Sequence, residues 1–229
     1  MLTAIDWTIK FRSLVPMNTK QHGEYYRALN QILRYYSNAG FMITAIHCDG
    51  EYRGMMEKVM DDLNMKMNFT NAQDHVPEAE RNNRTIKEHI RAAHQCLPYK
   101  AIPRIMIRYL AMNQANQLNL FPVKGGVSSY YSPCMILYTK HCTVPFGAYV
   151  QANHETVKTY LNITRTLDAI YMQPAQNQQG GHELMDLNSG RLITQNIVHE
   201  IPVTDGVIKD VETMAYEQAF KDLKFKNRH

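Results

Sequence analysis

A short, nearly continuous apolar run at 41–46 most constrains what this chain can fold into. The run reads Phe-Met-Ile-Thr-Ala-Ile; it follows Asn38-Ala39-Gly40, which favours the end of a helix, and precedes a polar stretch from His47 to Tyr52. A brief segment that is apolar on both faces is typical of a strand buried inside a sheet. We therefore expect a buried strand at 41–46.

The segments around this run alternate between helical and strand periodicity. Helical spacing of apolar residues predicts helices at about 19–38, 55–64, 77–95 and 101–119. Further strands are expected at 2–5, 9–15 and 65–69. This alternation predicts an α/β fold for residues 1–125.

The C-terminal part of the chain has a different character. It contains short strand-like segments, at 146–150, 167–171, 182–187 and 191–198. Asn188-Ser189-Gly190 predicts a hairpin turn between the last two of them. We expect a linker over 126–142, a small β module over 143–203, and a C-terminal helix and tail over 204–229, with the helix near 205–222.

Composition excludes several other classes of protein. Of the 229 residues, 45 % are hydrophobic and 20 % are charged, which excludes a chain that is mostly disordered. No apolar run approaches the ~20 residues of a membrane-spanning helix, and the first residues lack the basic start of a signal peptide. The expected compartment is therefore the interior of the cell. Cys134, His141 and Cys142 could be imagined as zinc ligands, but no fourth ligand stands at zinc-finger spacing.

The positive charge of the chain is concentrated in one stretch. Residues 81–108 hold seven Lys and Arg residues and one acid, a net charge of +6, so the rest of the chain carries −2 of the total of +4. Within the helix expected at 77–95, Arg84, Lys87 and Arg91 recur at three and four residues and form one stripe. A solvated helix face would have the same pattern, but the local excess of positive charge favours a polyanionic partner.

Two carboxylates stand where they could hold a metal ion. Asp49 follows the strand expected at 41–46, and Glu80 lies in the first turns of the basic helix. Oxygen ligands of this kind suit Mg²⁺ and are typical of phosphoryl-transfer sites. The alternative is structural, because an acid near a helix N-terminus stabilises the helix dipole by roughly 0.3–1 kcal/mol.

Two motifs resemble the catalytic core of copia-type retrotransposon integrases. The run from Ile46 to Tyr52 is similar to the family's Asp-Asn-Gly-Gly-Glu-Phe-like motif, and Val76–Thr85 is similar to its Val-Ala-Glu-Arg-x-Asn-Arg-Thr-like motif. Leu2–Phe11 is similar to the family's second strand, and segments within 128–200 are similar to its linker and C-terminal module. The resemblance implies a ribonuclease-H-like mixed sheet with flanking helices, followed by a small SH3-like β-barrel.

The resemblance also implies a function. Asp49 matches the second acid of the family's Asp-Asp-Glu triad and Glu80 the third, which implies that both are catalytic and hold Mg²⁺ in a two-metal site. Such integrases join DNA strands and act as homo-oligomers on DNA, without a membrane or a small-molecule cofactor, so the nucleus is the expected compartment. The basic residues implied to bind the nucleic acid are Arg81, Arg84, Lys87, Arg91 and Lys100.

This sequence departs from the family pattern at several points. The first acid of the triad lies on a strand that precedes Leu2 in the resemblance, and the stretch between Asp49 and Glu80 is shorter than usual. Glu78 falls where the family carries no acid. We therefore expect a weak Mg²⁺ site and a protein that is inactive or fragmentary as an enzyme. The alternatives are a non-catalytic DNA-binding or assembly protein derived from a transposable element, or an unrelated α/β domain whose acids are structural.

Overall fold

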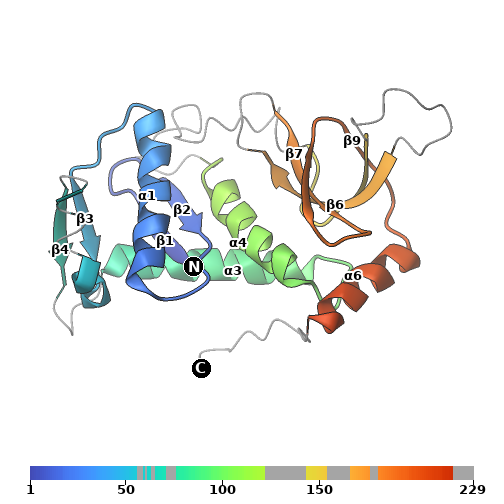
Figure 1. Cartoon of the computed structure of the whole chain (residues 1–229), viewed down its shortest axis with the longest axis horizontal. Coiled ribbons are helices and arrows are strands. Elements are labelled where there is room, and N and C mark those ends of the chain that lie inside the picture. Colours follow the sequence, from blue (N-terminus) through green and yellow to red (C-terminus); the bar gives the residue numbers. More distant parts are fainter. Residues whose placement is uncertain are drawn as a thin grey trace. The chain divides into compact units, whose positions relative to one another are not determined.

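The computed structural model describes residues 1–55, 59, 61–62, 65–70, 76–121, 143–153, 166–175 and 180–218. These residues form a mixed α/β structure with four α-helices and three separate sheets (Figure 1), which confirms the expected mixture of helices and strands. The chain divides into two compact units, one drawn from Met1–Glu88 and Ala115–Met135, the other from His89–Gln114 and Ile136–His229. The linker expected over 126–142 lies outside the described residues, so the domain limits taken from the sequence stay predictions.

The first unit begins with a β-hairpin. Strand β1 (Leu2–Ile5) pairs antiparallel with β2 (Arg12–Val15). The turn between them is held by Asp6, whose Oδ1 accepts hydrogen bonds from the backbone N–H groups of Thr8 at 2.8 Å and Ile9 at 2.7 Å. The chain leaves the turn through Lys10, whose φ of 56° is unusual for a residue other than glycine. Asp6 thus has a structural role in shaping the tip of the hairpin.

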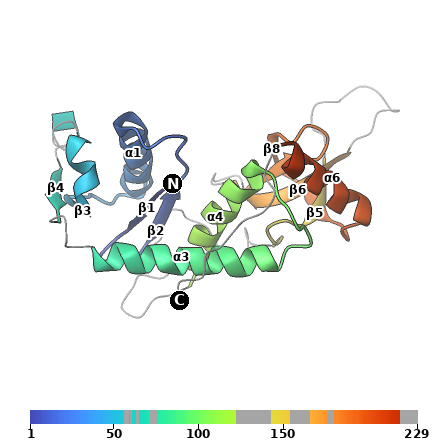
Figure 2. The ribbon, with the colours of Figure 1, turned by 90° about the horizontal axis from the view of Figure 1, so that it is seen from below.

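Helix α1 (His22–Asn38) packs on two small sheets of the first unit at once. Ala28, Ile32 and Tyr36 contact the hairpin through Phe11 and Val15. A second set of buried residues joins the same helix to the other sheet, and it comprises Tyr25, Leu29, Val59 and Met67. Figures 1 and 2 both show α1 between the two pairs of strands. The core of this unit is therefore organised around α1.

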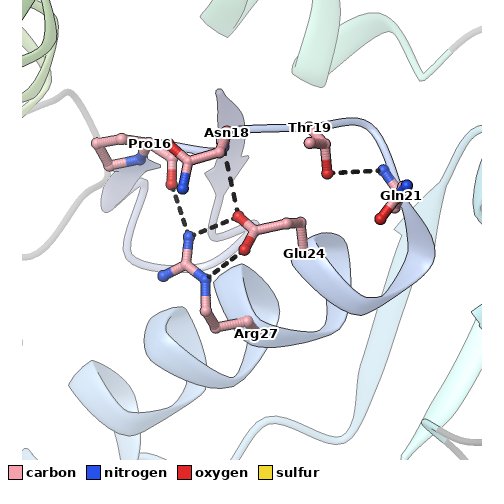
Figure 3. Close-up of polar contacts among 6 residues, drawn as sticks. All are labelled: Pro16, Asn18, Thr19, Gln21, Glu24 and Arg27. Atoms are coloured by element: carbon pink, nitrogen blue, oxygen red, sulfur yellow. Dashed lines mark hydrogen bonds and ion pairs between the residues drawn. The ribbon is translucent and has the colours of Figure 1, made fainter.

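The start of α1 is fixed by polar contacts with the preceding loop (Figure 3). The Arg27 guanidinium forms an ion pair with Glu24, with Nη2 3.0 Å from Oε2, and it also donates to the backbone carbonyl of Pro16 at 3.0 Å. Glu24 accepts a further hydrogen bond from the backbone N–H of Asn18 at 3.4 Å. These bonds hold the chain between β2 and α1 against the first turns of the helix.

The second sheet of this unit corrects one expectation from the sequence. Strand β3 (Ala45–Cys48) pairs in parallel with β4 (Lys66–Phe69), but the apolar residues from 41 to 43 precede the strand. The residues of β3 alternate between exposed and half-buried, so the expectation of a buried strand at 41–46 was wrong. The physical reason is that Phe41 and Ile43 pack against the cluster formed by α1 and the hairpin, outside any ladder. A short 3₁₀ helix, η1 (Gly50–Met55), follows β3.

The second unit contains a five-stranded antiparallel sheet in the order β8–β7–β6–β5–β9. Its strands are β5 (Tyr149–Asn153), β6 (Thr166–Pro174), β7 (His182–Asp186), β8 (Leu192–Gln195) and β9 (Val198–Glu200). The hairpin turn expected between β7 and β8 is confirmed, with Gly190 at a φ of 64°. Within the described part of the chain no ladder joins β8 to β9, so the sheet is open there and the closed barrel expected from the sequence is not formed.

Helices α4 (Arg104–Leu118) and α6 (Asp205–Glu217) contribute to the core of the second unit. The buried cluster takes Met106 and Leu110 from α4, Met172 from β6 and Val211 from α6. The hydroxyl of Tyr99 donates to the carbonyl of Gly147 at 2.9 Å, and burial raises the pKa of this phenol to about 12. None of the helices in the described ranges is both long enough and apolar enough to span a membrane.

Candidate nucleic-acid interface

Helix α3 (Pro77–Gln95) carries most of the residues that the sequence analysis assigned to DNA binding. Its bounds agree with the helix expected at 77–95, and Pro77 occupies the first helical position, where a missing N–H is tolerated. Asn82 and Ile86 are buried and define the face of the helix that packs inward. The opposite face is therefore free to carry polar and charged side chains.

Three cations of α3 lie on that exposed face. The side chains of Arg81, Arg84 and Lys87 are exposed. Because a helix repeats every 3.6 residues, Arg84 and Lys87 fall on one stripe that begins at Glu80. Arg91 continues this spacing but is half-buried, and it belongs to the second unit.

No ion pair within the described ranges neutralises Arg81, Arg84 or Lys87. Exposed cations without acidic partners create a local positive potential that attracts polyanions. Lys100 is also exposed, but it lies beyond α3 in the second unit, where its backbone N–H donates to Glu212 at 2.8 Å. The three unpaired cations of the first unit are thus the best-defined part of the candidate interface.

The β1–β2 hairpin lies beside the first half of α3 (Figure 2), and two side-chain contacts attach it there. Nζ of Lys10 lies 3.0 Å from Oε1 of Glu78, and both side chains are less than one-third exposed. Thr3 Oγ1 hydrogen bonds to Oδ1 of Asn83. The sequence analysis did not assign these contacts, although the unusual acid at Glu78 was an indication that this position has a role of its own.

The two candidate metal ligands both lie on the surface of the first unit. Asp49 comes directly after β3 and is exposed, and Glu80 is exposed near the start of α3. Burial raises the pKa of the neighbouring Cys48 thiol to about 11, and the negative charge of Asp49 adds to that increase.

Mg²⁺ is commonly held by one or two carboxylates and water, so these residues are chemically suited to it. Among the residues that the structure describes, however, no group of three or more His, Cys, Asp or Glu side chains is close enough to hold a metal ion. Asp49 and Glu80 therefore stay predictions as metal ligands.

A second polar cluster lies in the second unit, and the sequence analysis did not identify it. Nε2 of Gln173, a residue that is only 3 % exposed, donates to Oε2 of Glu183 at 2.7 Å. Burial raises the pKa of Glu183, and burial together with the Glu183 charge raises the pKa of Tyr109 to about 12. The sequence did contain an indication, because the polar Gln173 directly follows the apolar residues of β6 and is buried with them.

Comparison with known proteins does not assign a function to these residues. No family model matches the sequence, and no curated protein matches it.

Proposed function

We propose that this chain binds the phosphate backbone of DNA along α3, as a protein related to copia-type integrases. The observation that carries the proposal is that Arg81, Arg84 and Lys87 are exposed on one uninterrupted helix and take part in no ion pair within the described part of the chain. Contacts between such cations and phosphates provide affinity that does not depend on sequence. Arg91 and Lys100 are further candidate contacts in the second unit.

The order of elements in the first unit supports the ribonuclease-H-like part of the proposal. An antiparallel hairpin is followed by α1 and then by two parallel strands, and α1 packs on both pairs. No ladder joins β1 to β3 in the described ranges. This arrangement is compatible with the resemblance, which places a further strand between these two. The five short antiparallel strands of the second unit are likewise compatible with an SH3-like module.

The proposal assigns only limited catalytic activity to this chain. In the family, Mg²⁺-dependent strand transfer requires an Asp-Asp-Glu triad, of which this sequence offers Asp49 and Glu80. The proposal is that this chain retains the DNA-binding surface of an integrase and little strand transfer of its own. Homo-oligomerisation on DNA and residence in the nucleus belong to the same proposal.

Charge removal on α3 tests the proposed binding. The triple variant Arg81→Ala, Arg84→Ala, Lys87→Ala should bind a labelled duplex more weakly than the wild type, measured by fluorescence anisotropy at several salt concentrations. Each cation that contacts a phosphate contributes ~0.9 to the slope of log affinity against log salt, so the slope should fall by roughly 2 to 3. The affinity loss should be similar for duplexes of different sequence.

A matched control removes the same charge elsewhere. Arg34, Lys66 and Lys209 are exposed cations outside α3, and their replacement by Ala changes the net charge equally. This control variant should retain most of the affinity and the salt slope. Equal losses in the two triple variants would show that only total charge matters, and the proposed interface would then be rejected.

A further inference from the structure

The tip of the β1–β2 hairpin presents an exposed tryptophan beside the candidate interface. Trp7 is 71 % exposed, an unusually large fraction for the largest apolar side chain. It lies in the turn that Asp6 shapes through its bonds to the N–H groups of Thr8 and Ile9. The backbone that carries Trp7 is therefore held in a defined conformation although its side chain is open to solvent.

Lys10 connects this ring to α3. Its Nζ lies 5.2 Å from the centroid of the Trp7 ring and 3.0 Å from Oε1 of Glu78 in the first turn of α3. Arg81, an exposed cation, follows Glu78 by about one helical turn. An exposed aromatic ring thus lies on the hairpin that is attached to the half of α3 carrying the cations proposed to bind phosphates.

We propose that Trp7 stacks on an unpaired base of the nucleic acid whose backbone is bound along α3. This inference rests on the proposed function. Proteins that bind single strands combine a cationic surface for the backbone with aromatic side chains on which bases stack. A base inside a duplex has both faces covered by its neighbours, so Trp7 is available only to a base in a single-stranded segment.

The exposed cations of α3, on the helix to which the hairpin is attached, favour a nucleic acid over an apolar partner. Lys10 lies over the ring and is paired with Glu78, and Arg81 follows Glu78 by three residues on α3, whereas an apolar protein surface would have to desolvate the charges at the ring. A nucleotide supplies both the base for the ring and the phosphate for the cations. The expected ligand is therefore DNA that carries a single-stranded extension.

The chain offers a direct spectroscopic test, because Trp7 is its one tryptophan. Two probes are used, a short blunt duplex and the same duplex with a single-stranded thymidine extension. Binding is followed by anisotropy of a label on the DNA, and stacking is followed by quenching of tryptophan emission. We expect quenching that saturates with the extended duplex and little quenching with the blunt one.

Variants at Trp7 separate stacking from general apolar contact. Trp7→Ala should lower the affinity for the extended duplex by about tenfold and leave the blunt duplex nearly unchanged, since stacking on an aromatic ring typically has an effect of this size. Trp7→Phe should retain most of the affinity, whereas Trp7→Leu should not. Met42→Ala, at another exposed apolar side chain, is the matched control and should change nothing.

The outcomes distinguish this inference from the function on which it rests. If both DNAs bind but Trp7 emission does not change and Trp7→Ala binds normally, the stacking inference is wrong and DNA binding stands. Full affinity in Trp7→Leu would likewise overturn stacking. If neither DNA binds, the proposed function fails and the inference fails with it. A change of Trp7 emission with protein concentration alone would show that the ring is a contact between copies of the chain, which would also overturn it.

Discussion

The side chain of Asn119 pairs with the backbone of Arg12 in both directions. Nδ2 of Asn119 donates to the carbonyl of Arg12 at 2.8 Å, and Oδ1 accepts from the N–H of Arg12 at 2.8 Å. The amide group thus forms the two bonds that a neighbouring strand would form with β2. Asn119 belongs to the first unit, as Arg12 does, so these two bonds hold together segments of that unit that are far apart in the sequence.

Replacing Asn119 by Ala should destabilise the first unit. The substitution leaves one backbone donor and one acceptor of Arg12 without these partners, and the expected cost is about 1–3 kcal/mol in free energy of unfolding. The measurement is denaturant unfolding followed by circular dichroism. Asn116→Ala is a suitable control, since the Asn116 side chain makes no hydrogen bond within the described ranges. Equal stability of the two variants would contradict the role given to Asn119.

The ion pair between Lys10 and Glu78 should contribute a measurable coupling. Both side chains are partly buried, at 29 % and 28 % exposure, so solvent screens the pair less than an ordinary surface pair. A double-mutant cycle with Lys10→Met and Glu78→Gln is expected to give a coupling free energy of about 0.5–1 kcal/mol. A coupling near zero would mean that the pair does not hold the hairpin on α3.

Helix α3 shows which parts of this fold could be predicted from sequence. Its start at Pro77 and its helical spacing of buried and charged residues are local properties, and the observed bounds agree with the expected ones. The β7–β8 turn at Gly190 was predictable for the same reason. Strand β3 was not, because Phe41 and Ile43 before it pack on α1 and the hairpin instead of forming a ladder. Hydrophobicity alone does not show whether an apolar residue lies in a strand ladder or packs on a cluster outside any sheet.

The candidate interface was predictable only in part. The spacing of Arg84 and Lys87 places them on one helix face in any helix, so the stripe on α3 follows from the sequence. The contact between Lys10 and Glu78 joins residues 68 positions apart, and no local pattern indicates such a pair. Nor could the sequence show whether Trp7 lies in the core or in solvent, since that depends on how the hairpin packs.

Acid should weaken the contact of Glu24 with Arg27. The Arg27 hydrogen bond, followed by that from the Asn18 N–H, lowers the pKa of Glu24 below its usual 4.5. A carboxyl whose pKa is lower in the folded state contributes stability above the unfolded value and loses it as pH falls through the folded value. Glu24→Gln should therefore be less stable than the wild type at neutral pH, and the difference should shrink below about pH 4.5.

The Glu24 prediction is measured by thermal unfolding of the wild type and of Glu24→Gln, from below about pH 4.5 to neutral pH. In an Arg27→Ala background the effect of Glu24→Gln should become smaller, because the main cause of the pKa shift has been removed. A pH-independent difference between wild type and Glu24→Gln would contradict the assignment.

Glu183 should show the opposite dependence on pH. Burial raises the pKa of this carboxyl, and the hydrogen bonds from Gln173 and Tyr109 only partly oppose that effect. A carboxyl whose folded pKa is raised contributes stability that is present below the unfolded pKa and lost as pH rises through the folded pKa. Relative to Glu183→Gln, the wild type should therefore lose stability as pH rises above about 4.5, whereas Glu24 loses its contribution as pH falls below about 4.5. The measurement is the unfolding midpoint of the wild type and of each Gln variant in the same buffers. As pH rises, the advantage of the wild type over Glu24→Gln should grow, and its stability relative to Glu183→Gln should fall. Parallel trends would mean that Glu183 remains solvated in the folded protein.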